Sequence, residues 1–291
     1  MRLGEYVAKR TRAPTRAVYR VVRASLHRRA LRRSIELGRA LPEPPLRIDL
    51  TPGFAVLEAE QLAGVPEAVR EAQSLFAARG VDAPLTPRKN TYLQHIPIAS
   101  ALHLDSALLR LALDATLLYA ATEYLGALPV LSSLFCMHSP NVALAVDRYN
   151  SQAFHLDHDD TKQLKVFVYA SEVTRDSGPF HIIDAGRSRV LEARTRYHYR
   201  CPLGDETVQR LAGHPREIVG KAGTVIVADT SRCFHMGSRP GASARLTIGM
   251  QYLHPLAFEL PSGWPKGELA HLARPGLGAL INHVLGDARV H

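Results

Sequence analysis

Short β-type runs fill the second half of the chain and constrain its fold more than any other feature. They are rich in Val, Ile, Leu and aromatic residues, and Gly, Pro and Asp separate them. Five runs stand out, at residues 130–137, 142–146, 164–170, 223–229 and 245–253. No regular alternation of strand and helix accompanies them, which disfavours a parallel β/α fold. The pattern predicts an antiparallel barrel or jelly roll with helices packed outside it.

Helix-like apolar spacing lies on both sides of this strand-rich part. Residues 66–79 and 105–124 carry it, each followed by a glycine suited to a helix C-cap, and helix returns at about 277–285. With 291 residues, 46% of them hydrophobic, the chain can build a substantial core. We expect a single domain over residues 41–291, which begins with a short Pro-rich stretch at 42–45.

The net charge of +9 belongs to the N-terminal segment. Residues 1–40 contain 12 Lys and Arg against two Glu, a local charge of +10, so subtraction from +9 leaves −1 for residues 41–291. The domain itself therefore lacks the basic surface that nucleic-acid binding requires, and no nucleic-acid partner is expected. No run of about 18 apolar residues is present, which argues against a membrane-spanning helix.

The basic segment at residues 1–40 has the pattern of an amphipathic helix. Val18, Val22 and Leu26 recur at four-residue spacing, and Gly38 suits a C-cap. One interpretation is a helix docked on the main domain with its arginines in solvent. Two others stay open, namely a peripheral surface for anionic lipid or an acidic partner, and an Arg-rich organelle-targeting peptide.

The three cysteines are odd in number and widely spaced, and none forms a CxxC pair: Cys136, Cys201 and Cys233. This usage argues against a disulfide framework and against a cysteine zinc site. We therefore expect a reducing compartment, by default the cytoplasm.

The run FHLDHDD, residues 154–160, holds two histidines and three aspartates in seven positions. In a strand, His155 and Asp157 project to the same face, so one metal ion can contact both. A third ligand must come from elsewhere, and His235 qualifies because it follows the strand-like run 223–229 by a short turn. Two histidines and one carboxylate on one side of a metal are typical of non-haem Fe(II) oxygenases. With 14 histidines in the chain, spacing alone does not decide the matter.

Arg245 opens the run RLTIGMQYL and shares a strand face with Thr247. If Arg245 is buried it requires an anion, because its guanidinium cannot be neutralised. A dicarboxylate co-substrate can supply one, bound by the guanidinium fork with the Thr247 hydroxyl as a further donor. An exposed or internally paired arginine is the alternative.

Four blocks in consistent order carry a resemblance to a known family. They are NSQAFHLDHDDTKQLKVFVY, SGPFHII, GTVIVADTSRCFHMGSRP and RLTIGMQYL, within about residues 130–255. Together they resemble the phytanoyl-CoA dioxygenase family of Fe(II)- and 2-oxoglutarate-dependent oxygenases. The resemblance implies a mainly β fold with flanking helices around a double-stranded β-helix, the jelly-roll or cupin-like core.

The same resemblance implies roles for particular residues. Iron would bind His155, Asp157 and His235, and Arg245 would bind the 5-carboxylate of 2-oxoglutarate. Gln152 falls where related enzymes often carry a polar residue near the co-substrate. His158, Asp159 and Asp160 then lie just past the ligand pair, where a role in the turn is expected.

The implied reaction uses O2 to hydroxylate an unactivated C–H bond of a small-molecule substrate, with release of succinate and CO2. Because Asp157 is present where related halogenases carry a small residue, hydroxylation is favoured over halogenation. Asp229 and Asn150 are candidates to orient the histidines, although a surface turn is the expected place for Asp229. Lys89 is a further candidate contact for the co-substrate.

Two other classes of function remain open from the sequence. A cupin-type metalloenzyme that does not use 2-oxoglutarate, such as a hydrolase or isomerase, would share the same three ligands. A non-catalytic barrel that binds a ligand, or a membrane through residues 1–40, is the other.

Overall fold

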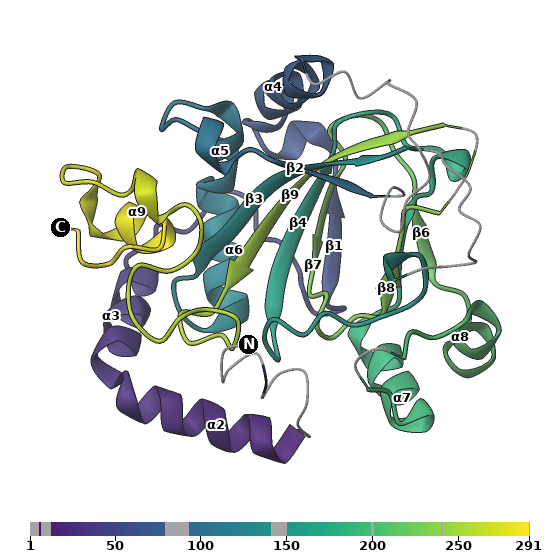
Figure 1. Ribbon diagram of the computed structural model, residues 1–291, viewed down its shortest axis with the longest axis horizontal. Coiled ribbons are helices and arrows are strands. Elements are labelled where there is room, and N and C mark those ends of the chain that lie inside the picture. Colours follow the sequence, from purple (N-terminus) through teal and green to yellow (C-terminus); the bar gives the residue numbers. More distant parts are fainter. Residues whose placement is uncertain are drawn as a thin grey trace.

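The computed structural model describes residues 6, 13–78, 93–140, 150–198, 201–239, 241 and 243–290. The strand predicted at 142–146, Lys89 and the side chain of Asn150 lie outside this part of the chain. A large curved sheet occupies the centre of the molecule, with helices over one face and a small sheet beyond the other (Figure 1).

The large sheet has six strands in the order β1-β7-β4-β9-β3-β2, all antiparallel to their neighbours. Its strands are β1 (Phe54–Leu57), β2 (Gln94–Pro97), β3 (Val130–Ser139), β4 (Gln163–Tyr169), β7 (Val225–Ala228) and β9 (Arg245–Leu253). Strands β3, β4, β7 and β9 correspond to four of the five predicted runs. Strands β1 and β2 are four residues long and gave no recognisable pattern.

The small sheet has three antiparallel strands in the order β6-β5-β8. These are β5 (Phe180–Ile182), β6 (Arg216–Ile218) and β8 (His235–Met236). Two antiparallel sheets with helices outside them are the predicted jelly-roll arrangement. The described residues include no helix long and apolar enough to cross a bilayer.

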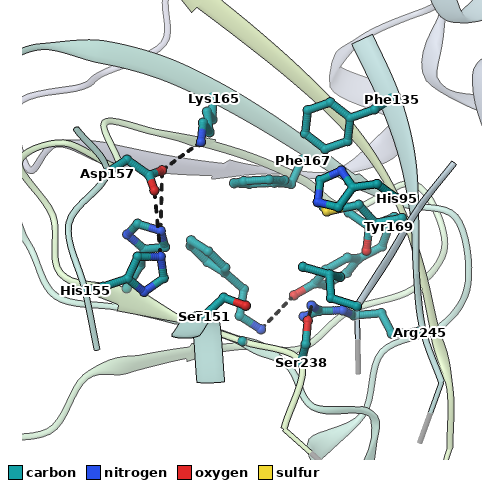
Figure 2. Close-up of a pocket in the computed structure, with 16 residues that line it drawn as sticks. His95, Phe135, Ser151, His155, Asp157, Lys165, Phe167, Tyr169, Ser238 and Arg245 are labelled. Carbon is teal, nitrogen blue, oxygen red and sulfur yellow. Dashed lines mark hydrogen bonds and ion pairs between the residues drawn. The ribbon is translucent and has the colours of Figure 1, made fainter. Parts of the chain in front are cut away.

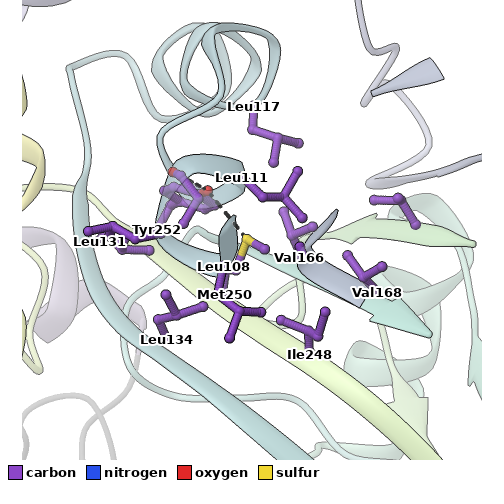
Figure 3. Close-up of a cluster of buried hydrophobic side chains, with 14 of the residues drawn as sticks. Leu108, Leu111, Leu117, Leu131, Leu134, Val166, Val168, Ile248, Met250 and Tyr252 are labelled. Carbon is purple, nitrogen blue, oxygen red and sulfur yellow. Dashed lines mark hydrogen bonds between the residues drawn. The ribbon is translucent and has the colours of Figure 1, made fainter. Parts of the chain in front are cut away.

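Side chains of the large sheet alternate between two buried environments. On β4, Leu164, Val166 and Val168 belong to the main hydrophobic cluster, together with residues of the helices α4 (Val65–Ala78), α5 (Ala107–Ala112) and α6 (Ala115–Leu125). Figure 3 shows this cluster between the sheet and the helices. The intervening side chains of β4, including Lys165 and Tyr169, line a cavity on the other face. The sheet therefore separates the main hydrophobic cluster from the cavity.

The helix predicted at 105–124 is two helices, α5 and α6. The helical conformation is interrupted between Ala112 and Ala115. The carboxylate of Asp114 accepts hydrogen bonds from the backbone N–H groups of Thr116 and Leu117. An aspartate in this position caps a new helix, and the apolar periodicity that runs across it did not reveal the break. Helices α7 (Ala185–Thr195) and α8 (Asp205–Ala212) were not predicted, whereas α9 (Gly278–Val284) was.

The N-terminal helix is also two helices, α2 (Ala13–Leu26) and α3 (Arg28–Arg39). Gly38 lies inside α3, so the predicted C-cap is wrong, and Ala40 occupies that position. A Cβ atom on Gly38 would lie 2.7 Å from Cγ2 of Thr122, so the glycine permits close packing of α3 on α6. The division of the chain near residue 40 stays a prediction.

Leu134 tests the helix-side core. It is 1% exposed on β3, opposite Met250 of β9. We expect Leu134→Ala to lower the free energy of unfolding by about 2–5 kcal/mol, since the cavity it leaves can collapse only in part. Urea unfolding measures the change, and Val190→Ala on the exposed face of α7 is the control, with an expected effect within about 0.5 kcal/mol. Equal small losses in both variants would contradict this packing.

Candidate metal and anion site

His155 and His235 face each other across an isolated antiparallel bridge. The backbone N–H of each donates to the carbonyl of the other, and both N–O distances are 3.1 Å. Residues that exchange both hydrogen bonds in this way present their side chains on the same side. The two imidazole rings accordingly lie with centroids 4.3 Å apart.

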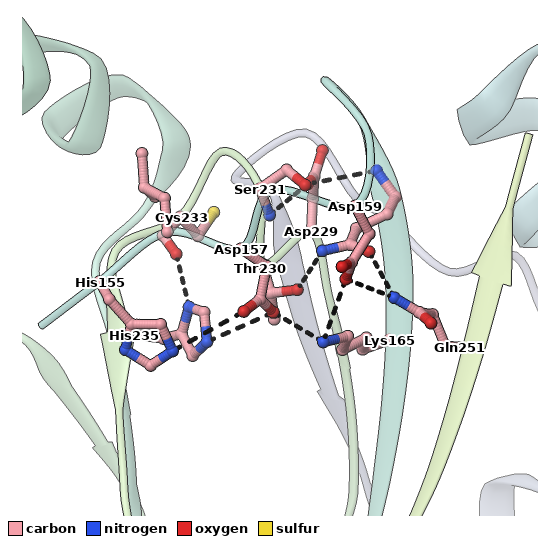
Figure 4. Close-up of polar contacts among 12 residues, drawn as sticks. His155, Asp157, Asp159, Lys165, Asp229, Thr230, Ser231, Cys233, His235 and Gln251 are labelled. Carbon is pink, nitrogen blue, oxygen red and sulfur yellow. Dashed lines mark hydrogen bonds and ion pairs between the residues drawn. The ribbon is translucent and has the colours of Figure 1, made fainter. Parts of the chain in front are cut away.

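Asp157 completes a group of three metal-ligand side chains. Its backbone N–H donates to Thr230 O at 2.9 Å, and its Oδ1 and Oδ2 lie 3.7 Å from Nε2 of His155 and of His235, respectively. One ligand atom from each of the three residues lies within 4.8 Å of the others (Figure 4). The structure thus brings together the three residues that the sequence indicated.

Backbone carbonyls fix the tautomer of both histidines. Nδ1 of His155 donates to Ala153 O and Nδ1 of His235 donates to Cys233 O, each at 3.0 Å. Each Nε2 therefore lies on the side of Asp157, 3.7 Å from one of its oxygens, where a metal ion can reach it. Burial, reinforced by the neighbouring His155, lowers the pKa of His235 to about 3, so this imidazole is neutral near pH 7.

Asp229 does not orient these histidines, nor does it lie at the surface as expected. It is fully buried and accepts hydrogen bonds from the Tyr124 hydroxyl at 2.6 Å and from the Ser231 N–H at 2.9 Å. Burial raises the pKa of Asp229 to about 6. Its role is to hold the turn between β7 and His235.

Lys165 of β4 is a further component of the site. Its Nζ lies 2.7 Å from Oδ2 of Asp157 and 3.7 Å from Oδ2 of Asp159, and Gln251 donates to the same Asp159 oxygen. Burial alone would raise the pKa of Asp157, but Lys165 and the two histidines hold it well below its usual range. Asp157 is thus ionised, and one of its oxygens is already hydrogen-bonded to Lys165.

The remaining polar residues of FHLDHDD lie outside the ligand group. His158 stacks on Tyr197 with ring centroids 6.1 Å apart, and burial lowers its pKa to about 4. Asp160 is buried and accepts a hydrogen bond from the backbone N–H of Thr161. These contacts stabilise the turn that follows Asp157.

Arg245 lies at the other end of the same cavity and is 5% exposed. Its Nη2 donates to Ser238 Oγ at 2.8 Å, while its Nε and the Thr247 hydroxyl have no hydrogen-bond partner among the described residues. In that part of the chain, no carboxylate lies within 4.0 Å of the guanidinium. Because a guanidinium stays charged even when burial lowers its pKa, this end of the cavity favours an anion.

Figure 2 shows both ends of this cavity, which has a volume of about 210 Å³. Aromatic side chains form its walls between the ligand group and Arg245: Phe135, Phe167, Tyr169 and Phe180. Apolar walls with a few convergent polar groups are typical of small-molecule sites.

Gln152 is not among the residues that line the cavity, and its predicted place near the co-substrate stays a prediction. It is 2% exposed, and its amide donates to Ser238 O at 2.9 Å. Gln152 therefore holds the residue that in turn contacts Arg245. The sequence did not predict a role for Ser238, because its position two residues after the end of β8 was the only feature that could have indicated one.

No model of a known protein family matches the sequence, and no curated protein matches it. EctD from S. alaskensis, crystallised with 2-oxoglutarate and 5-hydroxyectoine, is 22% identical, with a TM-score of 0.52 over 79% of this chain and 82% of that chain. HygX from Streptomyces hygroscopicus, with nickel and 2-oxoglutarate bound, is 18% identical, with a TM-score of 0.45 over 69% and 83% of the two chains. The epimerase SnoN from nogalamycin biosynthesis, with Fe3+, alpha ketoglutarate and nogalamycin RO, is 17% identical, with a TM-score of 0.49 over 86% and 92%.

The likeness to EctD concerns the fold. Together with the two antiparallel sheets it confirms the predicted double-stranded β-helix. Membership of the phytanoyl-CoA dioxygenase family stays a prediction.

Removal of the Lys165 cation tests the electrostatics of the ligand group. Without metal, Lys165→Met leaves Asp157 and Asp159 close together and without their ammonium partner, so we expect the free energy of unfolding to fall by about 3 kcal/mol. A divalent ion such as Co²⁺ should recover part of this loss, because it brings positive charge to Asp157. Urea unfolding with and without Co²⁺ measures both effects.

Lys221→Met is the matched control, because Lys221 is exposed and far along the chain from the motif. Its stability should not change in either condition. If, without metal, Lys165→Met had the same free energy of unfolding as Lys221→Met, the ion pair between Lys165 and Asp157 would not stabilise the protein.

Proposed function

We propose that this protein is an Fe(II)- and 2-oxoglutarate-dependent oxygenase. The observation that carries the proposal is the pairing of the ligand group at one end of the cavity with an unneutralised, buried Arg245 at the other. A cavity with these two ends suits a molecule with a metal-chelating group and a distal carboxylate. 2-Oxoglutarate has both, and the EctD structure holds it within the same fold.

The donor set fits Fe(II). Two imidazoles and one carboxylate form a face of three ligands, the arrangement of non-haem iron oxygenases. We infer that Nε2 of His155, Nε2 of His235 and one oxygen of Asp157 bind the ion. When bound, iron supplies the redox chemistry with O2 that side chains cannot perform.

The residues of the chain bind and orient the co-substrate, and they exclude water. The Arg245 fork and the Thr247 hydroxyl provide donors for the distal carboxylate, and the contact with Ser238 keeps the guanidinium in place. Lys165 occupies one oxygen of Asp157, which favours binding of the metal through the other. The aromatic walls keep the space between the two ends apolar.

Hydroxylation of an unactivated C–H bond of a small molecule, with release of succinate and CO2, is the reaction we infer. Asp157 supports it, because a carboxylate at this position leaves no vacant coordination site for a halide. The resemblance to the phytanoyl-CoA dioxygenase family points in the same direction. A cytoplasmic location is part of the proposal and rests on the three widely spaced cysteines.

A hydrolase or isomerase that does not use 2-oxoglutarate is the second candidate. It would need the same ligand group, but it would leave Arg245 without an anion in a buried position, which is costly. A non-catalytic barrel would not require two histidines grouped around a carboxylate. The first proposal accounts for both ends of the cavity.

Anaerobic titration with Fe(II) and 2-oxoglutarate tests the proposal. Chelation of iron by the keto acid should give a weak visible charge-transfer band in the wild-type protein. At the 2-oxoglutarate concentration that gives the band in the wild-type protein, we expect Arg245→Met to show no band although it still binds the metal. We expect His235→Gln to lose metal binding itself. Absorption spectroscopy and metal analysis measure the two steps separately.

Arg189→Met on the exposed face of α7 is the control and should leave the band unchanged. A metal-loaded wild-type protein that gives no band on addition of 2-oxoglutarate would eliminate this co-substrate. The cupin-type hydrolase or isomerase would then be the better interpretation.

A further inference from the structure

Helix α2 docks on the body of the protein through its polar residues, contrary to the expectation that its arginines face solvent. Arg23 is 4% exposed, and its Nη1 donates to Ala257 O at 2.6 Å. Arg20 forms an ion pair with Asp160 at 3.3 Å, and Tyr19 packs on Phe258 with ring centroids 5.7 Å apart. These contacts determine which side of the helix is turned outward.

The outward side of α2 is apolar. Val18, Val21, Val22 and Leu26 are 64%, 66%, 49% and 74% exposed, and their spacing places them on one helical face. They are four of the seven large hydrophobic side chains that are exposed among the described residues. Exposed hydrophobic residues scattered singly are ordinary, but a contiguous stripe on one helix indicates an interaction surface.

Exposed arginines follow this apolar stripe along the chain. Helix α3 starts two residues after Leu26, and its exposed residues include Arg28, Arg29 and Arg32. The only acidic residue in the segment 13–40 is Glu36, which pairs with Arg32 at 2.9 Å. The surface of α2 and α3 is therefore apolar in one part and strongly cationic in the next.

We propose that the outward surface of α2 and α3 binds an anionic lipid bilayer. The four apolar side chains would enter the boundary between headgroups and acyl chains, and the arginines would contact lipid phosphates, as in interfacial amphipathic helices. A second copy of the chain fits less well, because the same surface on a partner carries Glu36 as its single acidic residue and so offers little negative charge to complement the arginines. The charge of this surface thus selects the bilayer over self-association.

Binding does not require α2 to leave the body of the protein. The four apolar residues are exposed while Arg20, Arg23 and Tyr19 keep their contacts with the core. Arg20 also donates to the Thr161 hydroxyl, so α2 is held to the turn that follows FHLDHDD. The protein would therefore lie on the bilayer as a folded unit with the cavity region fixed relative to it.

Vesicle flotation of the full-length protein tests the proposal. Wild-type protein should float with vesicles of phosphatidylcholine and phosphatidylserine, and bind at least about tenfold more weakly to phosphatidylcholine alone. Binding should weaken as salt is raised, because salt screens the arginines. Failure of the wild-type protein to bind the anionic vesicles would overturn the proposal.

Two variants separate the apolar and the cationic contributions. Replacing Val18, Val21, Val22 and Leu26 together by Gln should weaken binding by at least about tenfold, since less apolar area enters the bilayer. Glutamine favours helix at least as well as valine, so α2 should stay helical. Val190→Gln, which changes an exposed valine on α7, is the matched control and should bind like the wild type.

Replacing Arg28, Arg29 and Arg32 by Gln should weaken binding to the anionic vesicles by roughly fivefold for each arginine and leave binding to phosphatidylcholine unchanged. The double change Arg189→Gln and Arg194→Gln on α7 controls for charge.

If the α2 variant floats like the wild type, the stripe is not the binding surface. If the wild type does not float but forms a dimer that the α2 variant lacks, the surface serves self-association instead. Neither result depends on the oxygenase activity.

Discussion

The reciprocal backbone hydrogen bonds between His155 and His235 are the constraint on which the rest of the site depends. They join the motif FHLDHDD to the two-residue strand β8 of the small sheet and direct both imidazoles to one side. Asp157, two residues further along an extended chain, then faces the same side. Because backbone carbonyls hold both Nδ1 atoms, the donor atoms are preorganised without any outer carboxylate.

The cavity is electrostatically asymmetric, and this asymmetry links structure to function. At one end, the charge of Asp157 is balanced by Lys165, and His235 is uncharged near pH 7. At the other end, Arg245 is buried with a hydroxyl contact but no carboxylate among the described residues. A divalent cation and a carboxylate together complement these ends better than either does alone, which is why one chelating dicarboxylate accounts for the whole cavity.

In helix α2 a charged side chain is buried and apolar side chains are exposed, the reverse of the usual arrangement. Arginine is usually at the surface, yet Arg23 is buried because backbone carbonyls of the segment 257–260 accept its N–H groups. The valines of α2 remain outside, where a soluble helix normally carries polar residues. The same segment thus contributes both an anchor to the fold and an apolar surface available to a partner.

By itself, the sequence determined the features that depend on local backbone geometry. Alternation along a strand placed His155 beside Asp157 and Arg245 beside Thr247, and the β-type runs predicted four strands of the large sheet. Only the tertiary structure decided which face of β4 lines the cavity, which side of α2 docks, and that Lys165 and Ser238 belong to the site. Periodicity separates two faces of a strand or helix but does not say which one meets a partner. That choice depends on contacts between segments distant in the chain, such as His155 with His235 in the ligand group and Arg23 with Ala257 beneath α2.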